Sequence, residues 1–179
     1  MDNTLLAFSS VLLLGLTFGC GKEPGSMNME TLRAQAQTEA QNLALVKNMW
    51  QAWIGGDYDA YRNALSPDYV WRSPSNLTDP LSREKTIEAG RSLRQAFPDA
   101  AYSLEEMIAS GDKVITRFVV RATHLGEFQG IPATGKKIEL SGIAIVRLEN
   151  GKVMEEREES DMLGLMRQLG RELTPKDAP

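Results

Sequence analysis

The sequence predicts a single α+β domain, with helices in its first half and a run of antiparallel strands in its second half. From Met29 to about Ile54, apolar residues recur at spacings of three and four, which is typical of a helix. Between residues 102 and 159, apolar and polar residues alternate and two short turn motifs interrupt them, which is typical of β-hairpins. This order of elements favours an α+β fold, and 179 residues suit one domain.

Composition excludes several classes of site. The chain has one His and one Cys, so it can form neither an intrachain disulfide nor a zinc site of several His and Cys ligands. The net charge is only -4, and no basic patch alternates with aromatic residues. We therefore expect neither a bound metal nor a nucleic-acid partner.

The first residues predict a targeting segment that is separate from the fold. Residues 5–19 form an apolar run that ends at Cys20, which is short for a membrane span and fits the apolar region of a signal peptide. Together with Cys20 it resembles the lipobox of bacterial lipoproteins, which implies a lipid anchor on Cys20 and a place in the bacterial cell envelope. The alternatives are an uncleaved anchor, a poorly ordered tail, or a secreted or periplasmic protein. We divide the chain into a signal segment 1–20, a linker 21–28, a domain 29–174 and a tail 175–179.

The first half of the domain predicts three helices and one strand. Gly55-Gly56 ends the first helix, and Asp57 caps a second helix that begins at Tyr58. Pro67 and Asp68 are expected to form a turn before an aromatic strand over residues 69–73. After a Pro-containing loop, the pattern predicts a helix over residues 83–97, which Ser82 caps and Pro98 ends.

The second half predicts four strands and a closing helix. The strands are expected over 102–109, 114–124, 136–148 and 153–159, and the helix over 161–170. Gly111-Asp112 and Asn150-Gly151 are the hairpin turns, of which Asn-Gly is the stronger signal. A sheet of this length curls, so helices covering one face would enclose a cavity for a small hydrophobic molecule. On the strand 114–124, His124 shares a face with Phe118 and is expected to point into that cavity.

The segment from His124 to Gly170 resembles the SnoaL-like polyketide cyclases of the NTF2-like superfamily. It reads H-x-G-E-F-x-G-I-P-A-T-G-K, then S-G-I-x-I, E-N-G-K-V-x-E-E and D-M-L-G-L-M-x-Q-L-G. The resemblance implies a cone in which a bent antiparallel sheet is wrapped by N-terminal helices around a central pocket, and a homodimer formed through the sheet. It also implies a cofactor-free ring closure of a polyketide ester, in which an aspartate acts as acid and base.

Three positions depart from the family pattern. Ala144 stands where the family often has the aspartate, Arg157 where it often has an aromatic residue, and Arg72 where it often has His or Asn. Alanine cannot act as a base, and an enzyme that removes a proton next to a carbonyl needs one within hydrogen-bond reach. The resemblance therefore leaves open whether the chain is an enzyme.

Two residues are candidates for catalysis, each with a structural alternative. His124 is the one side chain that titrates near neutrality without a shift, but it could instead fix the loop over residues 126–135. Asp161 could lie at the mouth of the pocket, or cap the last helix. The acidic residues Glu155, Glu156, Glu158 and Glu159 are expected to pair with arginines across the sheet.

We expect the ligand site to be mostly aromatic. Its predicted members are Trp53, Tyr69, Trp71, Phe118, His124, Ala144 and Arg157. Three functions are compatible with these observations: a cofactor-free cyclase or isomerase, a non-enzymatic binding protein for a small hydrophobic molecule, and a dimeric interaction module. A carboxyl group on the pocket wall would favour the first, and a pocket well below about 300 Å³ would favour the third.

Overall fold

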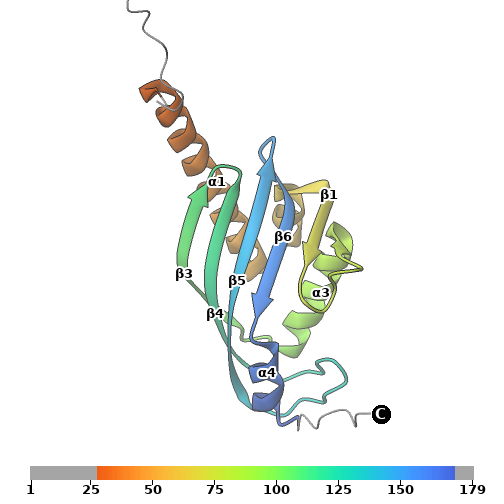
Figure 1. The fold of residues 1–179 in the computed structure, drawn as a ribbon. Helices are drawn as coiled ribbons and strands as arrows, with labels where there is room; N and C mark the ends of the chain where they lie inside the picture. Colours follow the sequence, from red (N-terminus) through yellow and green to blue (C-terminus); the bar gives the residue numbers. More distant parts are fainter. Residues whose placement is uncertain (1–27, 172–179) are drawn as a thin grey trace, which may run out of the picture.

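The computed structural model describes residues 28–171, which form one six-stranded sheet and four α-helices (Figure 1). The helices are α1 (Met29–Gly55), α2 (Tyr58–Ala64), α3 (Arg83–Ala96) and α4 (Met162–Leu169). The strands are β1 (Leu65–Arg72), β2 (Leu81–Ser82), β3 (Ala101–Ser110), β4 (Lys113–Thr123), β5 (Lys137–Glu149) and β6 (Lys152–Ser160). The α+β fold class is thus confirmed.

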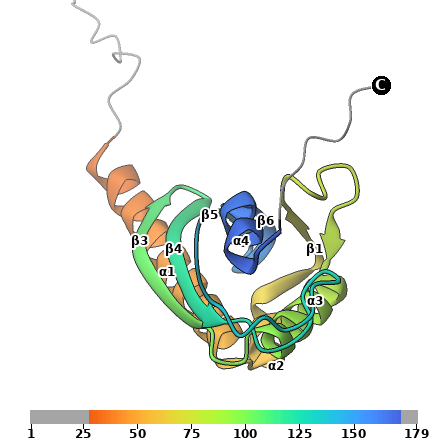
Figure 2. The same cartoon turned by 90° about the horizontal axis from the view of Figure 1, so that it is seen from below.

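The sheet has the order β2-β1-β6-β5-β4-β3. It is curved, so that one face is concave and the other is convex (Figure 2). β3 to β6 pair antiparallel in chain order through two hairpins, as predicted. Asn150 and Gly151 both have positive φ angles, 51° and 70°, which a two-residue hairpin of this type requires. β1 lies on the far side of β6 and runs parallel to it, so that the first and the last strands of the chain are neighbours.

The strand β1 differs from its prediction. We expected a turn at Pro67 and Asp68, but both residues lie inside β1, which begins at Leu65. Its pairing with β6 shifts register between Leu65 and Val70, so the proline occupies the irregular part of the strand. Proline has no N–H to donate to a ladder and is tolerated at such irregularities. The parallel pairing of β1 is a long-range contact that local sequence patterns do not encode.

Capping residues fix the helix ends as the sequence predicts for α1 and α2. Gly56 follows α1 with φ 73°, and the Asp57 side chain accepts a hydrogen bond from the Ala60 N–H at 3.0 Å. Ser82 occupies the N-cap position of α3 but makes no side-chain capping bond. Its carbonyl instead accepts a hydrogen bond from the Thr86 hydroxyl at 3.0 Å. α1 packs against β3 and β4, and α3 packs against β1 and β2.

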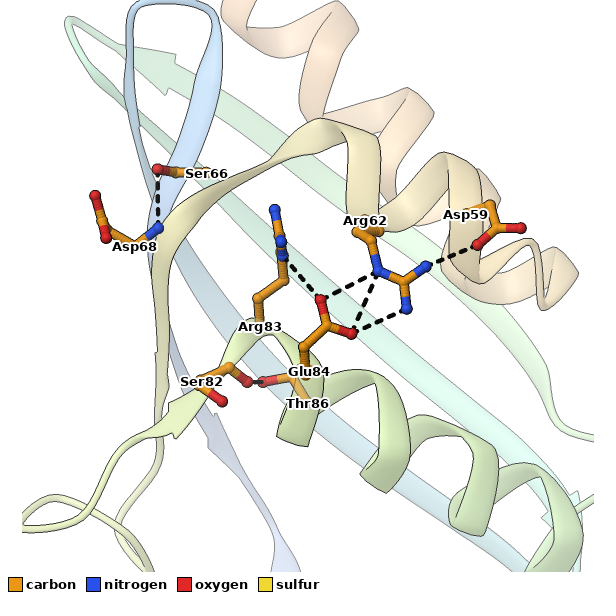
Figure 3. A network of polar contacts seen from close by, with 8 residues as sticks. All are labelled: Asp59, Arg62, Ser66, Asp68, Ser82, Arg83, Glu84 and Thr86. Atoms are coloured by element: carbon orange, nitrogen blue, oxygen red, sulfur yellow. Dashed lines mark hydrogen bonds and ion pairs between the residues drawn. The ribbon is translucent and has the colours of Figure 1, made fainter.

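Ion pairs tie α2 to the start of α3 (Figure 3). The Arg62 guanidinium contacts Asp59 at 2.8 Å and Glu84 at 2.9 Å, and Arg83 also reaches Glu84 at 3.2 Å. Both carboxylates are largely exposed and both arginines are partly exposed, so the network adds little free energy of folding, on the order of 1 kcal/mol or less per pair. It orients the two short helices that cover the sheet beside β1.

The predicted targeting segment lies outside the described residues, as do Cys20 and the predicted tail. Within residues 28–171, no helix combines the length and the apolar character needed to cross a bilayer.

Candidate functional site

The curved sheet and its helices enclose a cavity of about 650 Å³. This volume lies within the range of small-molecule sites and well above the ~300 Å³ limit set above. Aromatic side chains dominate its wall. They are Trp50, Trp53, Tyr58, Tyr61, Trp71, Phe97, Tyr102, Phe118 and Phe128. Its charged lining residues are Arg94, Glu127, Glu156, Glu158 and Asp161.

A β-bulge in β6 decides which acidic side chains face this cavity. Leu148 pairs with Val153, and the preceding residue Arg147 pairs with Glu155, so Met154 is an extra residue in β6. Val153 is fully buried on the inner face. Without the bulge, strict alternation would place Glu155 on the same face as Val153. With it, Glu156 and Glu158 point inward, and both line the cavity.

Glu156 lies deep in the wall and is only 4% exposed. The Tyr69 hydroxyl donates a hydrogen bond to its Oε2 at 2.9 Å. Burial and, to a smaller extent, the negative charge of Glu158 raise the pKa of Glu156 to about 8, against the opposing effect of the hydrogen bond from Tyr69. The carboxyl therefore holds a proton at neutral pH.

Glu158 is the second inward carboxyl, two residues further along β6. Burial raises its pKa to about 7, although hydrogen bonds from Ser160 and Trp71 partly offset that effect. A group with this pKa is divided between its acid and base forms at neutral pH, which suits proton transfer. The two carboxyls stand side by side on an aromatic wall, and sequence reasoning assigned neither of them to the site.

Of the two outward acidic side chains, Glu155 pairs with arginines as predicted, whereas Glu159 makes no ion pair within residues 28–171. Glu155 contacts Arg72 at 3.0 Å, Arg157 at 3.2 Å and Arg147 at 3.8 Å. Desolvation raises the pKa of Glu155, but hydrogen bonds from Arg157 and Arg72 outweigh it and lower the pKa overall. The expectation that Glu156 and Glu158 also pair with arginines is wrong, because the bulge turns them away from that face.

Two glycines let aromatic rings reach the cavity wall. A Cβ at Gly142 would lie 2.5 Å from the Phe118 ring, and one at Gly90 would lie 2.5 Å from the Trp53 indole. Real Cβ atoms do not approach this closely, so a side chain at either position would displace a ring of the wall. β5 and α3 thus keep room for these rings by lacking a side chain there.

The family model for SnoaL-like polyketide cyclases matches residues 44–169. The chain belongs to this family. Aklanonic acid methyl ester cyclase DnrD of Streptomyces peucetius is 28% identical over 128 residues, which cover 70% of this chain and 88% of that protein. The crystal structure of AclR from Streptomyces galilaeus is 31% identical with a TM-score of 0.68, and the match covers 77% of this chain and 87% of AclR.

A more distant SnoaL-like structure, from Jannaschia sp. CCS1, shares the fold. It is 23% identical with a TM-score of 0.70, and the match covers 76% of this chain and 96% of that one. The NTF2-like architecture inferred from the sequence is thereby confirmed.

Four of the residues predicted for the SnoaL-like site lie on the cavity wall. Trp53, Trp71 and Phe118 contribute aromatic surface, and Asp161 lies at the end of β6. The Asp161 carboxylate also accepts a hydrogen bond from the Gly164 N–H at 2.8 Å, so it caps α4. The Trp53 indole N–H donates to the Tyr102 hydroxyl at 3.3 Å, which connects α1 to β3 across the wall.

His124 lies behind the wall and is fully buried. The Phe97 ring, which does line the cavity, packs against the imidazole with ring centres 5.2 Å apart. The His124 Nδ1 accepts a hydrogen bond from the Thr134 N–H at 3.3 Å and lies 3.0 Å from the Thr134 hydroxyl. Backbone bonds join His124 to Gly135 and Lys136 as well, so this residue fixes both ends of the loop that follows β4.

The remaining predicted residues take other places. Tyr69 is buried behind Glu156, and Arg157 is exposed on the outer face of the sheet. Ala144, at the family's usual aspartate position, is fully buried in β5, and its partner across the ladder is Glu158. Directly paired residues of an antiparallel ladder have Cβ atoms about 5 Å apart on one face. Glu158 thus places a carboxyl beside the position that lacks one.

Proposed function

We propose that this SnoaL-like protein is a cofactor-free cyclase or isomerase that acts on a carbonyl or ester compound by general acid–base catalysis. The observation that carries the proposal is the carboxyl of Glu158, opposite Ala144 on an apolar cavity wall. The curated relatives are ester cyclases by name, which supports the reaction class.

In the proposed mechanism, ionised Glu158 takes a proton from a carbon next to a carbonyl group. The C–H electron pair then forms the enolate, and the Glu156 carboxyl, supported by Tyr69, donates a hydrogen bond to the enolate oxygen. The enolate carbon attacks a second carbonyl of the same molecule, which forms the C–C bond of the ring. The new alkoxide takes a proton, and Glu158 is the group that returns it.

The aromatic wall has two roles in this scheme. It binds a flat, largely apolar substrate through buried apolar area. It also excludes water, which strengthens the interactions of the two carboxyls with the developing charge. A 650 Å³ cavity accommodates a drug-sized molecule.

The test is a cyclisation assay with aklanonic acid methyl ester, the compound named for the relatives. We expect product formation by the wild type and a loss of about 10²–10⁴-fold in Glu158→Gln. The rate should rise with pH through about 7, because the base form of Glu158 is the active one. Glu159→Gln, which changes a neighbouring outward glutamate on the same strand, is the matched control and should keep the wild-type rate.

Deuterium exchange extends this test to an unknown natural substrate. If the wild type neither cyclises this ester nor exchanges deuterium into a generic 1,3-dicarbonyl compound, the alternative function is favoured. That alternative is a non-enzymatic binding protein or a dimeric interaction module. A full rate in Glu158→Gln would instead assign the base to another residue.

We further propose a lipid anchor at Cys20, a location in the bacterial cell envelope and a homodimer formed through the sheet. The apolar run over residues 5–19 supports the anchor. Exposed Ile143 and Ile145 on the outer face of β5 support the dimer. Equal labelling of wild type and Cys20→Ser by a palmitate analogue would contradict the anchor, and a monomeric mass at micromolar concentration would contradict the dimer.

A further inference from the structure

The inward carboxyls of β6 lack a cationic partner in the part of the chain that the structure describes. Neither Glu156 nor Glu158 takes part in any ion pair there, whereas the outward Glu155 contacts three arginines. The single basic side chain on the cavity wall is Arg94, and its Nη2 already donates to the carbonyls of Trp53 and Ile54 at 3.2 and 2.6 Å. A buried carboxyl group without a cation holds its proton, as Glu156 does at neutral pH, so a cation is the partner that the charged forms of this pair lack.

The described residues around the carboxyls do not form a metal site. No group of three or more His, Cys, Asp or Glu side chains there is arranged to hold a metal ion. Hard cations such as Ca²⁺ take six to eight oxygen ligands, which two glutamates do not supply. The wall beside them is instead made of indole and phenol rings, from Trp50, Trp53, Trp71 and Tyr102 among others.

Aromatic faces attract cations that carry carbon substituents. A substituted ammonium group gains electrostatic energy over an indole or phenol face, and its methyl or methylene groups bury apolar area against the same ring. A carboxylate nearby supplies the opposite charge. Acidic groups beside several aromatic rings in one enclosed space therefore match an organic cation better than a neutral ligand or a hydrated inorganic ion.

We propose that the cavity contains a subsite for an organic cation, an ammonium group with carbon substituents, between the Glu156 and Glu158 carboxyls and the aromatic wall. The subsite goes beyond the proposed cyclisation and does not depend on it. It specifies the class of molecule that the cavity selects, whether that molecule is transformed or only bound.

The ionisation of the two glutamates gives this subsite a pH dependence. A cation favours their charged forms, so its binding should tighten as pH rises through the range of about 7 to 8 in which they ionise. Tyr61 and Tyr69 stay neutral there because burial raises their pKa values well above 10. Arg94, Glu127 and Asp161 are the other charged groups on the wall.

Choline and 3,3-dimethylbutan-1-ol form a suitable probe pair, because they have the same shape and differ in one positive charge. Quenching of tryptophan fluorescence in the full chain reports their binding, since three of the wall residues are tryptophans. We expect choline to bind roughly tenfold or more tightly than the alcohol at pH 8.5, and the ratio to fall at pH 5.5 to the smaller preference that the aromatic rings alone provide. Equal affinities at pH 8.5, or no binding of choline, would overturn the proposal.

Two variants locate the charge. The double variant Glu156→Gln/Glu158→Gln should show at pH 8.5 only the smaller preference seen at pH 5.5, while Glu159→Gln should behave as the wild type. An undiminished preference in the double variant would overturn the proposal as well. The outcome is separable from the cyclisation assay: cation binding without ring closure contradicts only the proposed reaction, and ring closure without cation preference contradicts only the subsite.

Discussion

On the outer face of β6, Glu155 lies within ion-pair distance of three arginines and its pKa is lowered. On the inner face, its neighbour Glu156 has no cationic partner among residues 28–171, and its pKa is about 8. The two residues are identical in chemistry and adjacent in sequence. What differs is which side of the sheet they occupy. The comparison shows that surroundings, more than residue type, decide whether a glutamate stabilises the fold or is available to a ligand.

The first prediction concerns Glu156→Gln, which removes the ionisable carboxyl group from the inner face. The Glu156 pKa is about 8 in the folded chain against 4.5 for an unperturbed glutamate, so the folded state holds the proton more tightly. The free energy of unfolding should therefore fall as pH rises from about 4.5 to about 8. The variant should lose the part of this dependence that Glu156 contributes and keep the part that Glu158 contributes. Its free energy of unfolding should exceed that of the wild type by roughly 2–4 kcal/mol at pH 8.5, with little difference at pH 4.5.

Urea unfolding at several pH values measures this effect. Glu159→Gln is the matched control, because it removes a carboxyl from the outer face and should leave the wild-type slope intact. Parallel pH profiles for Glu156→Gln and the wild type would show that burial does not perturb the inner carboxyl.

The second test asks whether burial alone makes a polar group functional. His124 is as buried as Glu156 but is separated from the cavity by Phe97. His124→Ala should lower the free energy of unfolding by roughly 1–3 kcal/mol, because it leaves Thr134 without its partner and opens a void. Affinity for cavity ligands should change by less than about twofold, which corresponds to under 0.5 kcal/mol. If His124→Ala were as stable as the wild type but bound cavity ligands more weakly, His124 would be part of the ligand site.

The smallest effect is expected on the outer face. Arg157→Ala removes one of the three arginines around Glu155, and its side chain is largely exposed. The free energy of unfolding should change by less than about 1 kcal/mol. Cyclisation and ligand binding should match the wild type. A tenfold loss of either would mean that Arg157 acts on the cavity from outside the sheet.

The sequence allowed most elements to be predicted, because their signals are local. Asp57 and Asn150-Gly151 act through their own backbone neighbourhood, and both behave as expected. The parallel pairing of β1 with β6 and the strand through Pro67 depend on contacts between distant segments. Local patterns contain no information about such contacts.

The candidate site was harder to predict than the fold. Aromatic residues such as Trp53 and Trp71 were identified because large rings are buried in most settings. Glu156 and Glu158 were not, because a single extra residue at Met154 reverses the alternation on which their prediction relied. The apolar Val153, which must face the interior, was the one available clue, and it becomes informative only when the bulge is known.

Because of the bulge at Met154, the pairing register of β6 decides which side chains line the cavity. In a regular strand the same sequence would present Glu155, Arg157 and Glu159 to the interior. In that set the positive charge of Arg157 would lie between the two carboxylates. Loss of the bulge would convert one arrangement into the other without any substitution, because every residue after Met154 would then face the opposite side of the sheet. Homologous chains with similar composition can thus differ in what their cavities accept, and the pairing register around Met154 is the place to look for such a change.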